Sequence, residues 1–148
     1  MTATIDPAIV GTVHPTIETE IERGRLRAFA HAIGETDPVY SDLGAARAAG
    51  HPDLPVPPTF LFGIGSDMAW LDTLGIDLAA VLHGSQRFTY RSMAYAGDTL
   101  RFTPRIVDTY ERKGGALQFL VRETAVTRID GSAVADLQET IVVREVAP

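Results

Sequence analysis

The sequence contains no cysteine, which excludes disulfide bonds and thiolate metal sites. Lysine is nearly absent as well: Lys113 is the only one among the 13 lysine and arginine residues, and the arginines are spread along the chain. With a net charge of −6 and no basic patch, the protein is not expected to bind nucleic acid. The longest apolar runs, such as FLFGIG and LAAVL, are far shorter than the roughly 20 residues that cross a bilayer, so no membrane span is expected.

The 148 residues, 45% of them hydrophobic, are enough for one well-formed core. We therefore predict a single domain over residues 1–148. No basic start followed by an apolar stretch is found at the N-terminus, and we expect a cytoplasmic protein. The four histidines lack metal-ligand spacing, so no metal site is predicted.

The first half of the chain is predicted to combine one strand with small helices. Residues 12–21 alternate as a strand, and a proline within them places that strand at a sheet edge. Apolar residues at helical spacing predict a helix over 22–33, which a glycine ends. A second, alanine-rich helix is predicted over 42–49, with Ser41 or Asp42 as its N-cap.

The second half begins with a loop, 51–58, in which four of eight residues are proline. Residues 59–75 are apolar on nearly every side, which predicts a buried helix with Thr59 as its cap and with Phe62 and Trp70 in the core. From Leu82 onward the pattern is that of strands separated by turns, and an antiparallel meander is expected. Its four strands are predicted at 83–94, 98–112, 116–129 and 133–146.

This order of elements predicts an α+β fold in which a strongly curved antiparallel sheet wraps around one buried helix. That architecture is the hot-dog fold, here with extra short helices after the first helix. Because two such sheets can join edge to edge and remove an exposed edge strand, we expect a dimer.

Four stretches carry a resemblance to a known family. They are FAHAIGETDPVYSDLGAARAAG, VPPTF, LHGSQRF and YAGDTLRFTPRIVDTYERKGGALQFLVRET, which together span most of the chain. In these the chain resembles the MaoC-type hydratase/dehydratase family, and more narrowly its N-terminal-type, FAS1-like dehydratase branch. The resemblance implies an enoyl thioester of coenzyme A or acyl carrier protein as substrate, addition or removal of water as the reaction, and no cofactor.

The stretch GETDPVYSD, residues 34–42, corresponds to the family's catalytic motif Gly-Asp-x-Asn-Pro-hydrophobic-His-x-Asp but departs from it. Glu35 stands at the catalytic aspartate position, Asp37 at the asparagine position and Tyr40 at the catalytic histidine position. A phenol with a pKa near ~10 cannot accept a proton at neutral pH, although it can donate one. Either Glu35 and Tyr40 form a variant base–donor pair, or the loop is structural, with Asp37 in an Asx-type turn.

Binding residues are implied by the same resemblance. The start of the buried helix offers N–H groups that would polarise the thioester oxygen, and the LHGSQ stretch corresponds to a position near the substrate. The substrate-binding candidates are Asp37, Pro58, Thr59, Phe60, His83 and Gly84.

Three functions stay open. In the first, the chain is an enoyl-thioester hydratase or 3-hydroxyacyl-thioester dehydratase that uses Glu35 and Tyr40. In the second, it is a non-catalytic subunit, in a homodimer or in a heterodimer with a MaoC-type partner that holds an intact Asp/His pair. In the third, it is a hot-dog acyl-CoA thioesterase with Asp67 as its acid.

Overall fold

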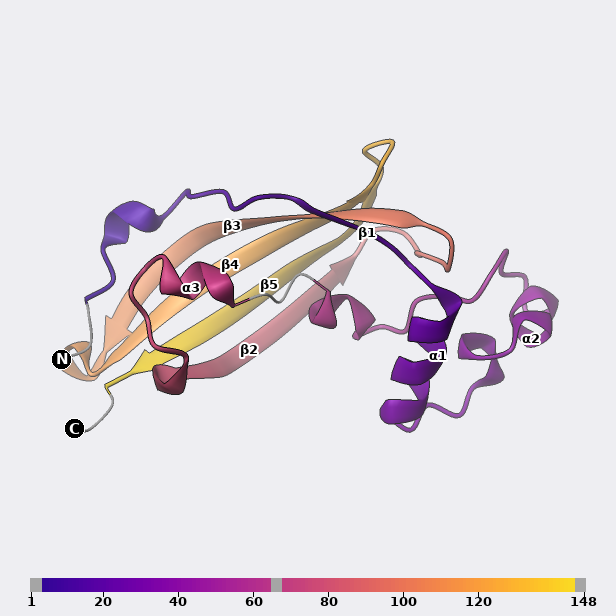
Figure 1. The fold of residues 1–148 in the computed structure, drawn as a ribbon, viewed down its shortest axis with the longest axis horizontal. Helices are drawn as coiled ribbons and strands as arrows, with labels where there is room; N and C mark the ends of the chain where they lie inside the picture. The colour runs from indigo at the N-terminus through magenta and orange to yellow at the C-terminus, as the bar shows by residue number, and fades with distance from the viewer. Residues whose placement is uncertain (1–3, 65–67, 146–148) are drawn as a thin grey trace.

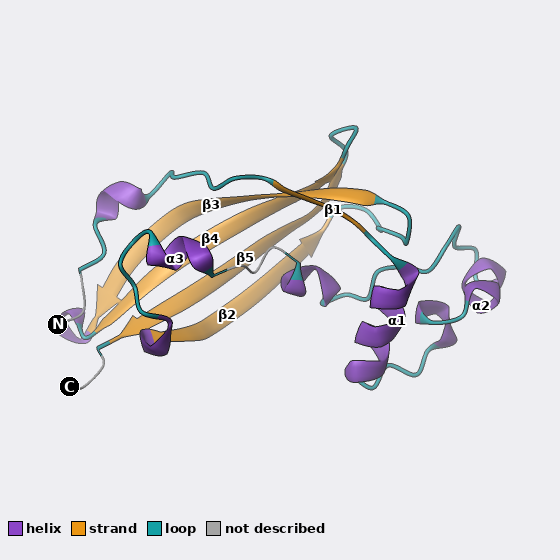
Figure 2. Ribbon diagram, in the orientation of Figure 1, coloured by secondary structure: helices purple, strands orange, loops and turns teal. Residues whose placement is uncertain are grey.

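The computed structural model describes residues 4–64 and 68–145. Its centre is one curved antiparallel sheet in the order β1-β3-β4-β5-β2, with short helices on its concave face and beside it (Figures 1 and 2). This arrangement confirms the predicted hot-dog fold. The strands are β1 (Ile17–Glu20), β2 (Val81–Tyr90), β3 (Thr99–Arg112), β4 (Leu117–Arg128) and β5 (Ala133–Arg144). Among the helices of the described residues, none has the length and apolarity to cross a membrane.

The predicted meander is correct for three of its four strands. β3, β4 and β5 are consecutive neighbours, joined through the glycine turns at 113–115 and 130–131. β2, however, pairs with β5 rather than with β3, and therefore forms the opposite edge of the sheet. The connection over residues 91–98 is too long for a tight hairpin. It pairs instead with the proline-rich loop, where Val56 N–H donates to the carbonyl oxygen of Ala94 at 2.9 Å.

β1 is an edge strand, as the proline that precedes it predicts, and among the described strands it pairs only with β3. The chain before it already follows β3, because His14 N–H donates to the carbonyl oxygen of Pro104 at 2.9 Å. The segment that precedes β1 thus runs along β3, at the edge of the sheet that lies opposite β2 (Figure 1).

The helices α1 (Arg23–Ala32) and α2 (Leu43–Ala48) form a small lobe beside the sheet (Figure 1). Both predicted ends are confirmed: Gly34 has a positive φ of 72° after α1, and Asp42 caps α2 by accepting the Ala45 N–H at 2.6 Å. The loop between the two helices is GETDPVYSD, so the caps that end α1 and begin α2 also position the family's motif.

The apolar segment predicted as one helix is divided in the structure. A 3₁₀ turn covers Phe60–Gly63, and α3 covers Ala69–Asp72. The predicted cap is wrong, because the Thr59 side chain makes no capping hydrogen bond and is exposed. Glycine in a helix interior is unfavourable, which is consistent with a turn that ends at Gly63. Trp70 is buried as expected, whereas Phe62 is 38% exposed.

In the described part of the chain, the core consists of two apolar clusters rather than one. The first lies under the α1–α2 lobe and includes Leu26, Phe60 and Phe102, and the second lies under α3 and includes Leu71, Leu120 and Ile141. Between them a polar row crosses the concave face: in the pairing of the strands, Gln86 on β2 is opposite Glu139 on β5, which is opposite Arg122 on β4. We call these three residues the polar row.

Candidate functional site

The motif loop uses its own carboxylates to hold its shape. Asp37 accepts the Val39 N–H at 3.0 Å, which is the predicted Asx-type turn, and Glu35 accepts the Asp37 N–H at 2.9 Å. Both side chains belong to exposed residues. Each carboxylate therefore contributes to the turn that carries Tyr40.

Tyr40 sits at the end of this turn and is half-buried. Burial, and in second place the negative charges of Glu35 and Asp37, raise the pKa of the Tyr40 phenol above its usual 10. The phenol is therefore protonated at neutral pH, where it can donate a hydrogen bond or a proton but cannot act as a base.

A cavity of about 340 Å³ lies beside Tyr40. Pro58, also predicted from the sequence, lines the same cavity, and most of the remaining wall is apolar. None of the described residues that line it is an aspartate, a glutamate or a histidine. The full lining is Tyr40, Val56, Pro58, Leu61, Tyr90, Arg91, Ser92, Met93, Ala94 and Val134.

Two further predicted binding residues flank this cavity without lining it. Thr59 is exposed, and Phe60 is only 5% exposed because its ring packs into the first core cluster, edge-on to Phe29 at 5.4 Å between ring centroids. The Arg25 guanidinium lies 5.9 Å from the centroid of the Phe60 ring. Phe60 thereby supports the turn from which Leu61 reaches the cavity.

His83 and Gly84 lie on edge strand β2, and neither lines the Tyr40 cavity. The His83 ring packs edge-on against Phe62, and its Nε2 is 3.9 Å from the Glu139 Oε2. Gly84 lies where the β2–β5 register shifts; a Cβ there would be 3.0 Å from the carbonyl oxygen of Thr140. This close approach of two backbones explains the glycine.

The other histidines and the alternative acid are placed as follows. His31 is exposed on α1, and His51 Nδ1 lies 3.2 Å from the hydroxyl oxygen of Tyr95. Asp67, the acid of the thioesterase hypothesis, lies outside the described residues. Within the described ranges, no three histidine, aspartate or glutamate side chains are grouped so that they could hold a metal ion.

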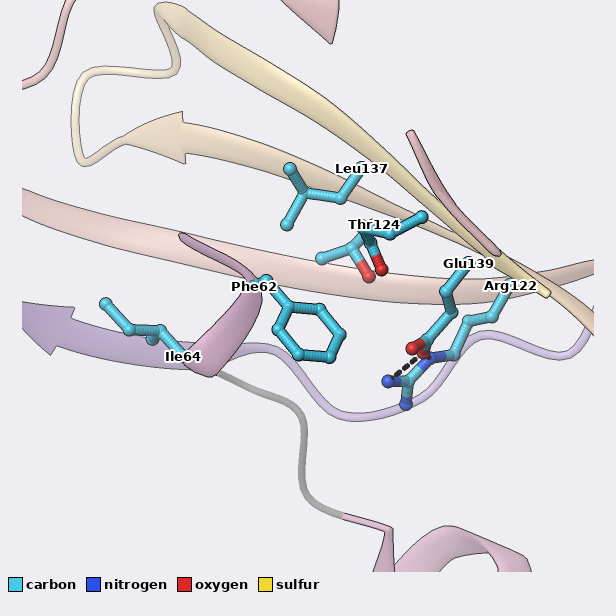
Figure 3. A pocket seen from close by; sticks show the side chains of 7 residues that line it. Phe62, Ile64, Arg122, Thr124, Leu137 and Glu139 are labelled. Carbon is cyan, nitrogen blue, oxygen red and sulfur yellow. Dashed lines mark hydrogen bonds and ion pairs between the residues drawn. The ribbon is translucent and has the colours of Figure 1, made fainter. Parts of the chain in front are cut away.

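The buried ion pair of the polar row was missed by the sequence reasoning. Arg122 and Glu139 point toward one another on the concave face, opposite the Phe62 ring (Figure 3), and their side chains are 4% and 7% exposed. Trp70 lies over the Arg122 guanidinium at 4.9 Å from its ring centroid. The alternation of β4 contained the signal, because Arg122 shares its face with Leu120 and Val126.

Strand order, curvature and a mainly apolar cavity beside the GETDPVYSD loop define a MaoC-like hot-dog domain. The family model described as "FAS1-like, dehydratase domain region" matches residues 8–137, and the chain belongs to this family. It is 41% identical over 107 residues to a UPF0336 protein of Streptomyces coelicolor, with 69% of this chain and 71% of that protein covered. A UPF0336 protein of Saccharopolyspora erythraea is 34% identical, with 97% and 94% covered.

Solved structures agree with this assignment. The C-terminally truncated HadBC (3R-hydroxyacyl-ACP dehydratase) complex of Mycobacterium tuberculosis contains a similar chain, with a TM-score of 0.80, 25% identity, and 95% of this chain and 99% of that chain covered. R-hydratase PhaJ1 of Pseudomonas aeruginosa has a TM-score of 0.67 at 17% identity, with 94% and 88% covered, which shows likeness of fold alone.

Proposed function

We propose that the chain is the acyl-binding subunit of an enoyl-thioester hydratase or 3-hydroxyacyl-thioester dehydratase, and that a partner subunit supplies the catalytic base. The substrate is a thioester of coenzyme A or acyl carrier protein, and the reaction uses no cofactor. One observation carries the proposal: the Tyr40 cavity is lined mainly by apolar side chains, with a protonated phenol, Arg91 and Ser92, but by no described carboxylate or imidazole.

The chemistry explains why that observation matters. Water that attacks the β-carbon must lose a proton to a base, and the α-carbon must receive one. Tyr40 can fill only the donor role at neutral pH. Glu35 belongs to an exposed part of the loop and does not line the cavity, and its carboxylate accepts the Asp37 N–H. A mainly apolar cavity with no carboxylate or imidazole among its described lining residues suits binding of an acyl chain.

The edge strand β2 supports the proposal of a partner. Among the described strands, β2 pairs on one side only, with β5, and an unpaired strand edge favours association with another sheet. Leu82 and Tyr90 on this strand and Met93 just after it are 49%, 47% and 51% exposed. We propose that a second hot-dog subunit with an intact Asp/His pair covers this edge in a heterodimer, and that a homodimer covers the same edge when the partner is absent.

The test is hydration of enoyl-CoA thioesters by three samples: the purified chain alone, the chain with Glu35→Ala, and the chain co-expressed with a MaoC-type subunit that has the Asp/His pair. We expect no turnover above background for the first two samples and turnover for the third. Turnover by the chain alone that Glu35→Ala abolishes would overturn the proposal in favour of a Glu35–Tyr40 active site. Tyr40→Phe in the co-expressed complex, which removes only the phenolic oxygen, reports whether the Tyr40 hydroxyl contributes to kcat or only to KM.

A further inference from the structure

The edge strand β2 carries one permanent charge, at Arg87. The next residue, Phe88, packs against the first core cluster, so Arg87 faces the convex side of the sheet, where it is exposed. None of the described residues forms an ion pair or a side-chain hydrogen bond with the Arg87 guanidinium. The proposed acyl-binding role does not use this side chain.

Two carboxylates on the same face of the sheet are already engaged by other groups. Arg87 is opposite Gln138 on β5, and the Gln138 amide donates to the Glu123 Oε1 at 2.9 Å. Asp136, two residues before Gln138, accepts two hydrogen bonds from the Arg91 guanidinium, at 3.0 and 2.8 Å. When another strand covers the edge, Arg87 loses part of its hydration, and only an acceptor on the covering strand can compensate for that loss.

A second copy of this chain does not provide such an acceptor. The register of β2 shifts between His83 and Ser85, which leaves 85–90 as the regular part of its edge. Directly opposite residues of an antiparallel pair share a face. Two such edges that pair about a twofold axis, with both concave faces on one side, therefore place Arg87 opposite Arg87 or Thr89 of the second copy in the two registers that pair most of the edge.

Both registers bring the two copies of Arg87 close together. They are directly opposite in the first register and diagonal in the second, with Cβ atoms about 5–8 Å apart. This separation is within the ~8 Å Debye length at physiological ionic strength, so the two guanidinium charges repel each other. A carboxylate at the same place in another strand would attract Arg87 instead.

We propose that the β2 edge fits a partner strand that presents a carboxylate opposite or diagonal to Arg87, and that Arg87 disfavours pairing with a second copy of this chain. The difference between attraction and repulsion at one position gives the edge its choice of partner. This inference rests on the proposed function in one point only, namely that a partner subunit covers the β2 edge. It does not depend on acyl binding or turnover.

The chain with Arg87→Glu is the probe, because its edge differs from that of the parent in the sign of this charge. The parent chain and a tagged Arg87→Glu chain are mixed in equal amounts, left to exchange subunits, and analysed by native mass spectrometry at low ionic strength. The measured quantity is the squared amount of mixed dimer divided by the product of the two homodimers. We expect it to exceed its random-mixing value by about fourfold or more, because attraction in the mixed dimer replaces repulsion in both homodimers.

The matched control is a tagged chain with Arg105→Glu. Arg105 is an exposed arginine of β3, which is not an edge strand, and its guanidinium lies 4.0 Å from the Glu123 carboxylate. This charge reversal should leave mixing with the parent chain random. In the complex with a co-expressed MaoC-type subunit, Arg87→Glu should raise the Kd by about twofold or more, whereas Arg87→Lys, which keeps the charge, should raise it less.

Four results would overturn the proposal: no mixed dimer, random mixing of the parent with Arg87→Glu, equal enrichment with Arg105→Glu, or a MaoC-type subunit that binds Arg87→Glu as tightly as the parent chain. The proposed function fails on different evidence. Enriched mixed dimers together with a co-expressed complex that shows no turnover would contradict the acyl-binding role alone, and turnover together with random mixing would contradict only the role of Arg87.

Discussion

Removal of one side chain of the buried Arg122–Glu139 ion pair should destabilise the protein far more than removal of both together. The Arg122 and Glu139 side chains are only 4% and 7% exposed, so neither charge can recover its hydration if its partner is lost. A lone buried charge costs about 3–5 kcal/mol. Arg122→Met, which keeps much of the apolar stem, should lower the free energy of unfolding by that amount, a large part of the ~5–15 kcal/mol typical of a domain.

The double variant provides the decisive comparison. With Arg122→Met and Glu139→Leu together, no unpaired charge is left, and apolar side chains of similar volume continue the two core clusters across the polar row. We expect the double variant to lie within about 1 kcal/mol of the parent protein or above it. The double-mutant cycle should therefore give a coupling energy of at least about 5 kcal/mol, because each single loss costs about 3–5 kcal/mol and the double loss at most about 1 kcal/mol. His83, whose Nε2 is 3.9 Å from the Glu139 Oε2, is beyond hydrogen-bond distance of this carboxylate.

Urea unfolding followed by circular dichroism, at one fixed protein concentration, measures these free energies. The matched control is Asp136→Asn, which breaks the exposed Arg91–Asp136 pair, whose side chains are 55% and 51% exposed. It should change stability by less than about 1 kcal/mol. The reasoning is refuted if Arg122→Met costs no more than this control, or if the double variant is as unstable as the sum of its two single variants.

Three smaller perturbations test other parts of the structure. Asp42→Ala removes the acceptor of the Ala45 N–H and should cost about 1 kcal/mol in thermal or urea unfolding, whereas Asp42→Asn, which keeps an acceptor, should cost less. Burial and the Arg122 charge hold the pKa of His14 below 6.5, so the contribution of neutral His14 to stability is complete above pH 6.5 and declines as the pH falls below it. His14→Gln should therefore make the loss of stability at acid pH shallower. An unchanged dependence of the unfolding free energy on pH would count against this. Gly84→Ala places a Cβ 3.0 Å from the backbone of the facing strand and should lower the unfolding midpoint, while an equal or higher midpoint would show that β2 shifts freely.

Local chemistry made the α1–α2 lobe predictable from sequence. The side chains of Asp42 and Asp37 accept the backbone N–H groups of residues that lie three and two positions further along the chain. Gly34 takes the positive φ that ends α1. These features depend on neighbours within a few residues, so a pattern along the chain contains them. The position of β1 at an edge followed in the same way from its preceding proline.

Features that depend on distant partners were not predictable. The pairing of β2 with β5 depends on the path of the connection 91–98, and that connection is hydrogen-bonded to the proline-rich loop. Phe62 has a large apolar side chain, as core residues do, but is 38% exposed. Arg122 and Glu139 are 17 residues apart in sequence, and only the register of β4 against β5 brings them together. The candidate site shows the same division: Tyr40 and Pro58 line one cavity, while His83 and Gly84 lie on edge strand β2 and do not line it.

The Tyr40 cavity and the free edge of β2 are continuous, which links the two parts of the proposed function. Tyr90 belongs to β2 and also lines the cavity, and Met93, which lines it too, is 51% exposed. A partner that pairs with β2 would therefore also cover the open rim of the cavity. The base that the cavity lacks would then come from the same surface that completes its wall. On this argument, loss of the partner should weaken acyl binding as well as abolish turnover, because one contact provides both.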